Sequence, residues 1–174
     1  MVRLYFLTQT RPWEPFDEEE RVNIQKLMTA ACVAAVALAV SGCATPGAGK
    51  VVLSTDKIYP AIGPYSQMVG HGNVIYFSGV IALNRAGTAI EGTTIEEQTR
   101  LVLDYIGAEL GSQGLGYDDV LTSTVYMKDL NEFAAMNAVY GQYFRKDPPA
   151  RATLEVARLP RDARIEIAVI AARR

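Results

Sequence analysis

The chain has 174 residues, enough for one domain of ordinary size and a terminal segment. Its 17 Lys and Arg against 19 Asp and Glu give a net charge of −2, so the sequence lacks the basic surplus of nucleic-acid-binding proteins, and we expect no nucleic-acid partner. Cys32 and Cys43 both precede residue 50, and His71 is the only histidine. Residues 51–174 therefore exclude a disulfide and a cysteine-type metal site, and one histidine does not make a zinc site, so we expect no metal.

An apolar segment near the N-terminus indicates export. Residues 27–42 are apolar or small, and this length suits the core of a signal peptide better than a membrane span. The segment ends in Val40-Ser41-Gly42-Cys43, which resembles the bacterial lipobox, a signal for lipidation of the cysteine and cleavage before it. A buried apolar helix of the domain is the alternative. We predict a lipid anchor on Cys43 and a location on the periplasmic side of a bacterial membrane, the outer membrane in a Gram-negative host.

The segment boundaries follow from composition. Residues 1–21 do not suit the basic start of a signal peptide, because five acidic residues lie between positions 14 and 20. We predict that residues 1–21 are a mistranslated or non-native extension, with Val22 as the true start. The signal peptide then covers residues 22–42, a flexible tether rich in small residues covers 43–50, and one domain covers 51–174.

The domain sequence predicts strands alternating with helices. Strand-favouring runs at residues 50–54 and 73–78 are separated by Gly, Pro and Asn, as in a meander. Thr94 and Glu97 have the capping-box spacing, and helical periodicity then continues to Leu110. There follow a strand (121–127), a helix (about 131–145) and two strands (152–157 and 164–171). This order predicts an α/β (α+β) sandwich with about six strands and two helices on one sheet face.

The pattern of the strands leaves one sheet face to be covered. The run Val74-Ile75-Tyr76-Phe77 is apolar on both faces, and a second copy of the chain is the economical cover for the face without helices. In the last strand Ile165 and Ile167 share one face, and Glu166 lies on the other. A carboxylate on a covered face needs a partner, water or a function, so Glu166 is a candidate site residue. An interface salt bridge is the alternative.

Two further polar residues occupy informative positions. Arg151 follows Pro148 and Pro149, a rigid lead-in, and a guanidinium held there suits bidentate binding of a small carboxylate. The pattern alone favours a surface arginine. Asn137 lies in the predicted apolar stripe of the second helix, so its amide needs partners in a core or in a site. That stripe consists of Phe133, Met136, Asn137, Tyr140 and Phe144.

Five segments together resemble the RidA (YjgF/UK114) family of reactive-intermediate deaminases. They are PAIGPYSQ at 60–67, IYFSG at 75–79, EQTR at 97–100, NEFAAMNAVY at 131–140 and PPARATLEVARLP at 148–160. Each is weak alone, but their order and spacing match the family from about residue 51 to the C-terminus. The resemblance implies a chorismate-mutase-like sandwich with a mixed sheet, assembled as a homotrimer with active sites in the clefts between subunits.

The resemblance also implies an activity: hydrolysis of 2-imino or 2-enamino acids, such as 2-iminobutanoate and 2-iminopropanoate, to 2-keto acids and ammonia, without a cofactor. Arg151 would bind the substrate carboxylate and Glu166 would position the water. The family's other pocket residues correspond to Tyr65, Ser78, Asn137 and Thr153, the last through its backbone. Val80 stands where Gln is usual and Ala168 where a second Glu is common, and both bear on substrate range.

Two other functions compete with the deaminase. One is a non-catalytic trimeric module, chaperone-like or binding small carboxylates. The other is an endoribonuclease, which the single histidine and the near-neutral charge disfavour. The presence of both Arg151 and Glu166 favours the deaminase, because a pure carboxylate binder has no need of Glu166.

Overall fold

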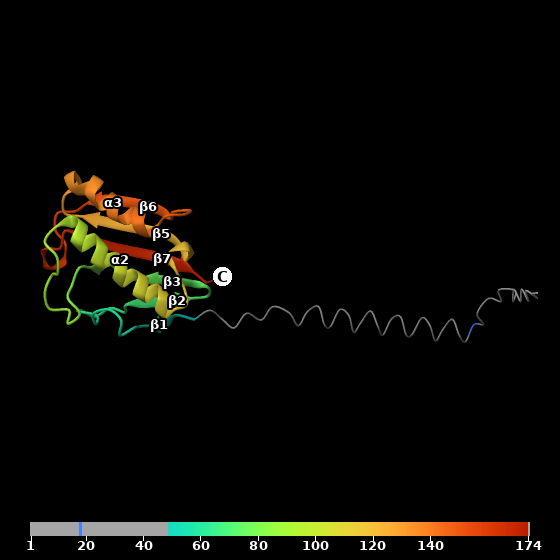
Figure 1. Ribbon diagram of the computed structural model, residues 1–174. Coiled ribbons are helices and arrows are strands. Elements are labelled where there is room, and N and C mark those ends of the chain that lie inside the picture. Colours follow the sequence, from blue (N-terminus) through green and yellow to red (C-terminus); the bar gives the residue numbers. More distant parts are fainter. Residues whose placement is uncertain (1–17, 19–48, 174) are drawn as a thin grey trace, which may run out of the picture. The chain divides into compact units, whose positions relative to one another are not determined.

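The computed structural model describes residue 18 and residues 49–173, and these form the basis of all that follows (Figure 1). The predicted extension, signal peptide and lipidated Cys43 lie outside the described residues. Residues 49–173 contain β1 (Val51–Leu53), β2 (Met68–His71), β3 (Val74–Phe77), β4 (Val80–Ile81), α2 (Ile95–Ser112), β5 (Val120–Met127), α3 (Phe133–Tyr143), β6 (Ala150–Glu155) and β7 (Ile165–Ala172). In this part of the chain, no helix combines the length and the apolar character needed to cross a membrane.

The strands form one mixed sheet. Their order is β1-β2-β3-β7-β5-β6, with the short β4 also paired to β7. All pairs are antiparallel except β5 with β6, which are parallel and joined through α3. This confirms the predicted mixed sheet with two helices. The sheet has seven strands rather than about six. The sequence did not predict β2, which contains Gly70 and His71, or β4, which has only two residues.

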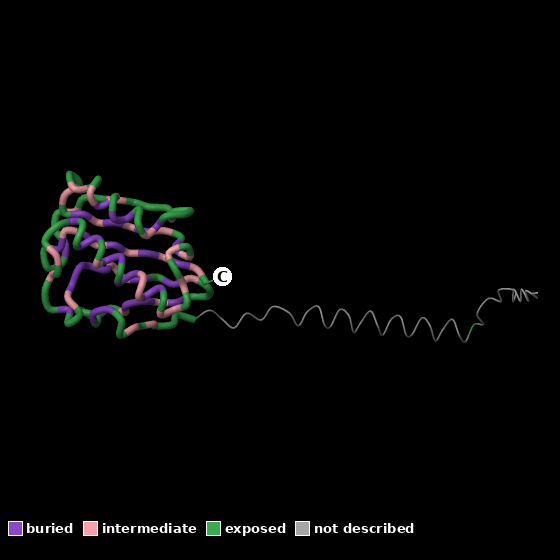
Figure 2. Tube along the Cα trace, viewed as in Figure 1, coloured by how far each residue is buried: buried purple, intermediate pink, exposed green. Residues whose placement is uncertain are grey.

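Both helices cover the same face of the sheet, as Figure 1 shows. Thr94 and Glu97 make the reciprocal hydrogen bonds of the predicted capping box at the start of α2. The buried residues come from the helices and from the strands that they cover, and are coloured purple in Figure 2. They include Ile165, Ile167 and Val169 of β7, as the alternation predicted, against Val102, Leu103 and Ile106 of α2 and Met136 of α3.

Within residues 49–173, no helix lies over the other face of the sheet. Tyr76 of β3 is 50% exposed, while its neighbours Ile75 and Phe77 are buried toward the helices. The second helix also departs from its predicted stripe. It ends at Tyr143 rather than Arg145, and Phe133 is exposed, whereas Met136, Tyr140 and Phe144 are buried.

Candidate active site

A cavity of about 270 Å³ lies against β7 near the segment that joins β3 to β4. Its lining brings together three residues that the sequence predicted for the site: Tyr65, Ser78 and Glu166. The other lining residues are Tyr59, Ile62, Gly79, Ile81 and Pro160. This volume suits a small organic acid, since pockets for larger organic ligands start at about 300 Å³.

Glu166 is the ionisable acid of this cavity. It follows the buried Ile165 in β7 and is half-buried on the face without helices. Removal from water raises the pKa of its carboxyl group above the ordinary value, because burial disfavours the charged form. Neither of the two ion pairs found within residues 49–173 involves Glu166 or Arg151. Within residues 49–173 Glu166 therefore has no cationic partner, and the alternative of a salt bridge to another subunit stays a prediction.

Gly79 determines how close the backbone comes to this carboxyl group. A Cβ atom built on Gly79 would overlap the carboxyl atoms of Glu166. Only glycine therefore allows the carboxylate to occupy its observed position. The sequence placed Gly79 in the family motif after Ser78 but did not single it out as a site residue.

The loop before β2 supplies the other wall of the cavity. The Tyr65 hydroxyl accepts a hydrogen bond from the Ile62 N–H at 3.2 Å, which ties the loop across itself. The Ser78 hydroxyl donates to the Ser66 carbonyl at 2.7 Å, and the Ser78 N–H donates to the Gln67 carbonyl. Because its hydroxyl proton is used in this way, Ser78 can offer a ligand only the lone pairs of its oxygen.

The remaining predicted residues form a second group around α3. The Arg151 guanidinium lies over the Tyr140 ring, 4.6 Å from its centroid, and 5.7 Å from that of Phe133. The Tyr140 hydroxyl is hydrogen-bonded to the buried Ser123 hydroxyl at 2.6 Å. Aromatic rings attract and orient a guanidinium, so Arg151 is exposed yet held in place. The exposed Phe133 thus has a role in this group rather than in the core.

Asn137 and Thr153 belong to the same group. Asn137 lies on α3 between Phe133 and Tyr140 at helical spacing and is half-buried. Thr153 follows Arg151 by two residues on β6, which places both on one face of the strand, and its Oγ1 is buried without a hydrogen-bond partner. These residues and the cavity are thus two separate groups.

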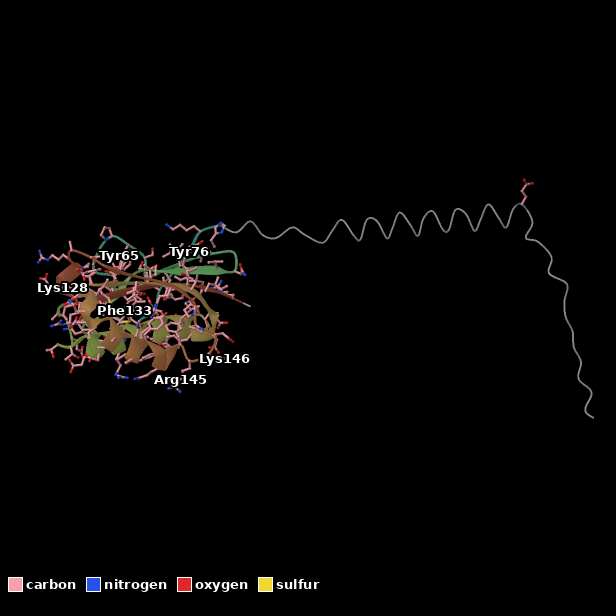
Figure 3. All side chains as sticks on the ribbon, turned by 90° about the horizontal axis from the view of Figure 1, so that it is seen from above. Tyr65, Tyr76, Lys128, Phe133, Arg145 and Lys146 are labelled. Atoms are coloured by element: carbon pink, nitrogen blue, oxygen red, sulfur yellow. The ribbon has the colours of Figure 1, made fainter. Side chains whose placement is uncertain are left out.

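The two groups lie on opposite faces of the sheet. Arg151 pairs with Ser123, whose side chain contacts α3, so Arg151 is on the helix-covered face. Glu166 lies between Ile165 and Ile167, which are buried beneath the helices, and so points the other way. In Figure 3, Tyr65 and Tyr76 lie on the strand side of the molecule, whereas Arg145 and Lys146 lie on the helix side. A single chain does not bring Arg151 to Glu166.

Comparisons with known proteins agree with this architecture. A family model described as Endoribonuclease L-PSP matches residues 55–173. A RutC family protein of Saccharolobus solfataricus is 48% identical over 122 residues, which cover 70% of this chain and 97% of that protein. The Capra hircus 2-iminobutanoate/2-iminopropanoate deaminase is 42% identical over 121 residues, covering 69% and 88%. The crystal structure of E. coli TdcF with bound serine has a TM-score of 0.67 at 36% identity, covering 71% and 99%.

The fold and the site define a small α/β sandwich protein with a carboxyl-bearing cavity on the open face of its sheet. The chain belongs to the Endoribonuclease L-PSP family, and its relatives include a Reactive Intermediate Deaminase A of Arabidopsis thaliana and the E. coli YjgF gene product. Some of its relatives are named as deaminases of reactive imine intermediates.

Proposed function

We propose that the protein hydrolyses small 2-imino or 2-enamino acids to 2-keto acids and ammonia. The observation that carries this proposal is the place of Glu166, a carboxyl group with a raised pKa in a cavity sized for a small acid. A base with a pKa nearer to neutrality transfers protons efficiently at neutral pH. The naming of a goat relative as 2-iminobutanoate/2-iminopropanoate deaminase supports this substrate class, and the serine bound to TdcF supports an amino-acid-like ligand.

In the proposed reaction the two groups divide the work. The Arg151 guanidinium binds the substrate carboxylate, and Glu166 orients a water molecule toward C2 and accepts its proton as the C2–O bond forms. Glu166 then passes this proton to the nitrogen, which gives an intermediate with a hydroxyl and an amino group on C2. In a second transfer Glu166 moves the hydroxyl proton to the amino nitrogen, so that the C2=O bond forms as the C2–N bond breaks and ammonia leaves. The keto acid remains, so no oxidant or cofactor takes part. Tyr65, Ser78, Asn137 and the backbone at Thr153 would shape the pocket.

A site that contains both the Arg151 group and the Glu166 cavity requires more than one chain. Because Arg151 and Glu166 lie on opposite faces of the sheet, we propose a homotrimer in which the Arg151 group of one subunit meets the cavity of the next. The open sheet face carries the exposed apolar side chains Tyr76 and Leu154, and several apolar side chains on one uncovered face support an interface there.

A direct assay tests the activity. The domain beginning near Lys50 should release ammonia from 2-iminopropanoate, generated in situ by an amino-acid oxidase, faster than buffer does. A ligand-binding module would bind 2-oxobutanoate without accelerating ammonia release, and that result would overturn the proposed enzymatic activity. The name of the matching family model raises the endoribonuclease alternative, but neither the net charge of −2 nor a cavity of this size favours a polynucleotide.

We also propose that the protein is exported and anchored to a membrane through lipid on Cys43. Support comes from the sequence alone: the apolar run at 27–42, the lipobox-like Val40-Ser41-Gly42-Cys43 and the tether after it. Two or more acyl chains on one cysteine anchor stably, since each buried methylene contributes about 0.8 kcal/mol.

A further inference from the structure

A second carboxyl group lies behind the proposed active site. Glu109 is on the buried side of α2, three residues after Ile106, and is only 1% exposed. Its Oε2 is buried and has no hydrogen-bond partner within the described part of the chain. A buried carboxyl group without a partner is costly, so it needs a specific explanation.

A small cavity beside Glu109 explains how its carboxyl group can be satisfied. An inner cavity of about 10 Å³ lies there, about the minimum that one water molecule requires. Its lining is Ile58, Tyr59, Ala61, Tyr65, Gln67, Ser78, Gly79, Val80 and Glu109. Tyr59, Tyr65, Ser78 and Gly79 also line the larger cavity that holds Glu166. These four residues therefore form the wall between the two carboxyl groups.

Tyr59 connects the two sides of this wall. Its hydroxyl accepts a hydrogen bond from the Ile81 N–H at 3.1 Å, which leaves its own proton for an oxygen in the cavity. Burial raises the pKa of Tyr59, and the nearby carboxylates of Glu109 and Glu166 raise it further. The phenol thus stays a neutral hydrogen-bond donor that is electrostatically coupled to both acids.

The charge state of Glu109 follows from its surroundings. The ionisable groups that face it are the phenols Tyr59 and Tyr65, with Tyr105 one turn earlier on α2 and Glu166 beyond Gly79. Among the described residues, no Lys, Arg or His lines the inner cavity. Burial raises the pKa of Glu109 to about 8, which favours the neutral carboxylic acid at pH 7.

We propose that Glu109 is a positioning residue of the site. As a neutral acid it binds one water molecule together with Tyr59, and this keeps the residues of the wall in place beside Glu166. Its ionisation weakens the binding of a carboxylate ligand. This inference rests on the proposed function for the class of ligand. When Glu109 ionises, its negative charge acts through a region of low dielectric on both the bound carboxylate and Glu166. The site should therefore lose affinity for its ligand in alkaline solution.

The first test concerns the charge state and does not depend on any activity. In infrared difference spectra of the wild-type protein against Glu109→Gln, the C=O band of a protonated carboxylic acid should be present at pH 7 and disappear with a midpoint near pH 8. The control is Glu96→Gln, on the exposed face of the same helix, which should remove no such band. A spectrum at pH 7 that shows only ionised carboxylate would overturn the inference.

The second test concerns the ligand. The Kd of 2-oxobutanoate, the stable keto-acid product expected from 2-iminobutanoate, should rise several-fold between pH 7 and pH 9 in the wild type and in Glu96→Gln. Glu109→Gln, which imitates the neutral acid, should bind as the wild type does at pH 7 and lose this rise. A purely structural role of Glu109 would change affinity without changing its pH profile, and persistence of the rise in Glu109→Gln would refute the proposal.

A second variant covers the case in which Glu109→Gln does not fold. Glu109→Leu matches the apolar neighbours Ile106 and Leu110 and should also abolish the alkaline rise of Kd. Because leucine cannot hydrogen-bond to the water, the Kd of Glu109→Leu for 2-oxobutanoate should be higher than that of the wild type at pH 7. Absence of 2-oxobutanoate binding at every pH in the wild type would instead refute the proposed ligand class, while the infrared titration still decides the charge state of Glu109.

Discussion

The missing side chain of Gly79 leaves the space that the carboxyl group of Glu166 occupies. The two residues come from adjoining parts of the sheet: Gly79 precedes β4, and Glu166 pairs with Ile81 of β4 across the ladder. The short β4 thus holds the glycine in register with the acid. Changing the size of residue 79 therefore changes the position of the acid.

Gly79→Ala should displace the Glu166 carboxylate and lower imine hydrolysis by roughly 10²-fold, as expected when a general base is misplaced. The fold should survive, because the overlapping atoms are the end of a flexible side chain. The control is Gly111→Ala, at the end of α2, where a Cβ meets no atom within 4 Å. It should keep full activity and gain stability, at most about 1 kcal/mol. Unchanged turnover in Gly79→Ala would argue against Glu166 as the base.

Arg151→Ala should lower kcat/KM by roughly 10²-fold or more, since loss of charge-assisted hydrogen bonds to a carboxylate costs about 3 kcal/mol. Arg151→Lys should recover only part of this loss, because an ammonium group keeps the charge but not the bidentate geometry. Arg145→Ala removes another exposed arginine, near the end of α3, and should leave the rate unchanged. Steady-state ammonia release decides between these outcomes, and equal rates for all three variants would contradict the role of Arg151.

The activity should have an acidic limb set by Glu166. A base must be unprotonated to accept a proton, so kcat/KM should fall as the pH drops through the pKa of Glu166, which burial raises above the ordinary carboxyl value of 4.5. Glu166→Gln should lower kcat much more than it weakens binding of 2-oxobutanoate, and it should abolish this limb. Equal losses of turnover and binding would mean that Glu166 holds the ligand rather than the water.

The proposed division of the site between subunits predicts complementation. Arg151→Ala and Glu166→Gln should each be nearly inactive alone. If the two are unfolded together and refolded as an equal mixture, roughly a quarter of the shared sites should regain both wild-type residues and their activity. Sedimentation should give three times the mass of one chain. A monomer, or a mixture that stays inactive although it assembles, would refute the shared site.

Lipidation of Cys43 predicts a mature protein that begins at this residue. Expressed in a bacterium, the full chain should be found in the membrane fraction, and mass spectrometry of the N-terminal peptide should show acyl chains on Cys43. Cys43→Ser should retain the signal peptide and lack the lipid. An unmodified Cys43 in the cytoplasmic fraction of the wild type would overturn this prediction and leave the catalytic ones untouched.

The sequence was sufficient for those features of the fold that depend on local pattern. The period of two in β7 predicted that Ile165 and Ile167 face the helices and that Glu166 does not, and the spacing of Thr94 and Glu97 predicted the start of α2. The strand β2 escaped prediction, because Gly70 and His71 do not favour strands and pairing on both sides stabilises them there.

The division of the candidate site could not be predicted from pattern. Which face Arg151 occupies depends on the pairing of β6 with β5, and strand register is a property of two segments together. Glu109 is recognisable from the sequence, since its charged side chain continues the apolar stripe of α2 three residues after Ile106. The sequence does not indicate a role for Tyr59, because this residue lies in a loop whose course only the tertiary structure defines.

The two halves of the proposed site differ in how firmly the sheet holds them. Glu166 is on β7, which is hydrogen-bonded to β3, β4 and β5, whereas Arg151 is on β6, which pairs with β5 alone at the edge of the sheet. Edge segments open locally at lower free energy than central strands, so amide hydrogens near Arg151 should exchange with solvent before those near Glu166. On warming, we therefore expect the proposed carboxylate-binding residue, Arg151, to lose its position before the proposed base, Glu166.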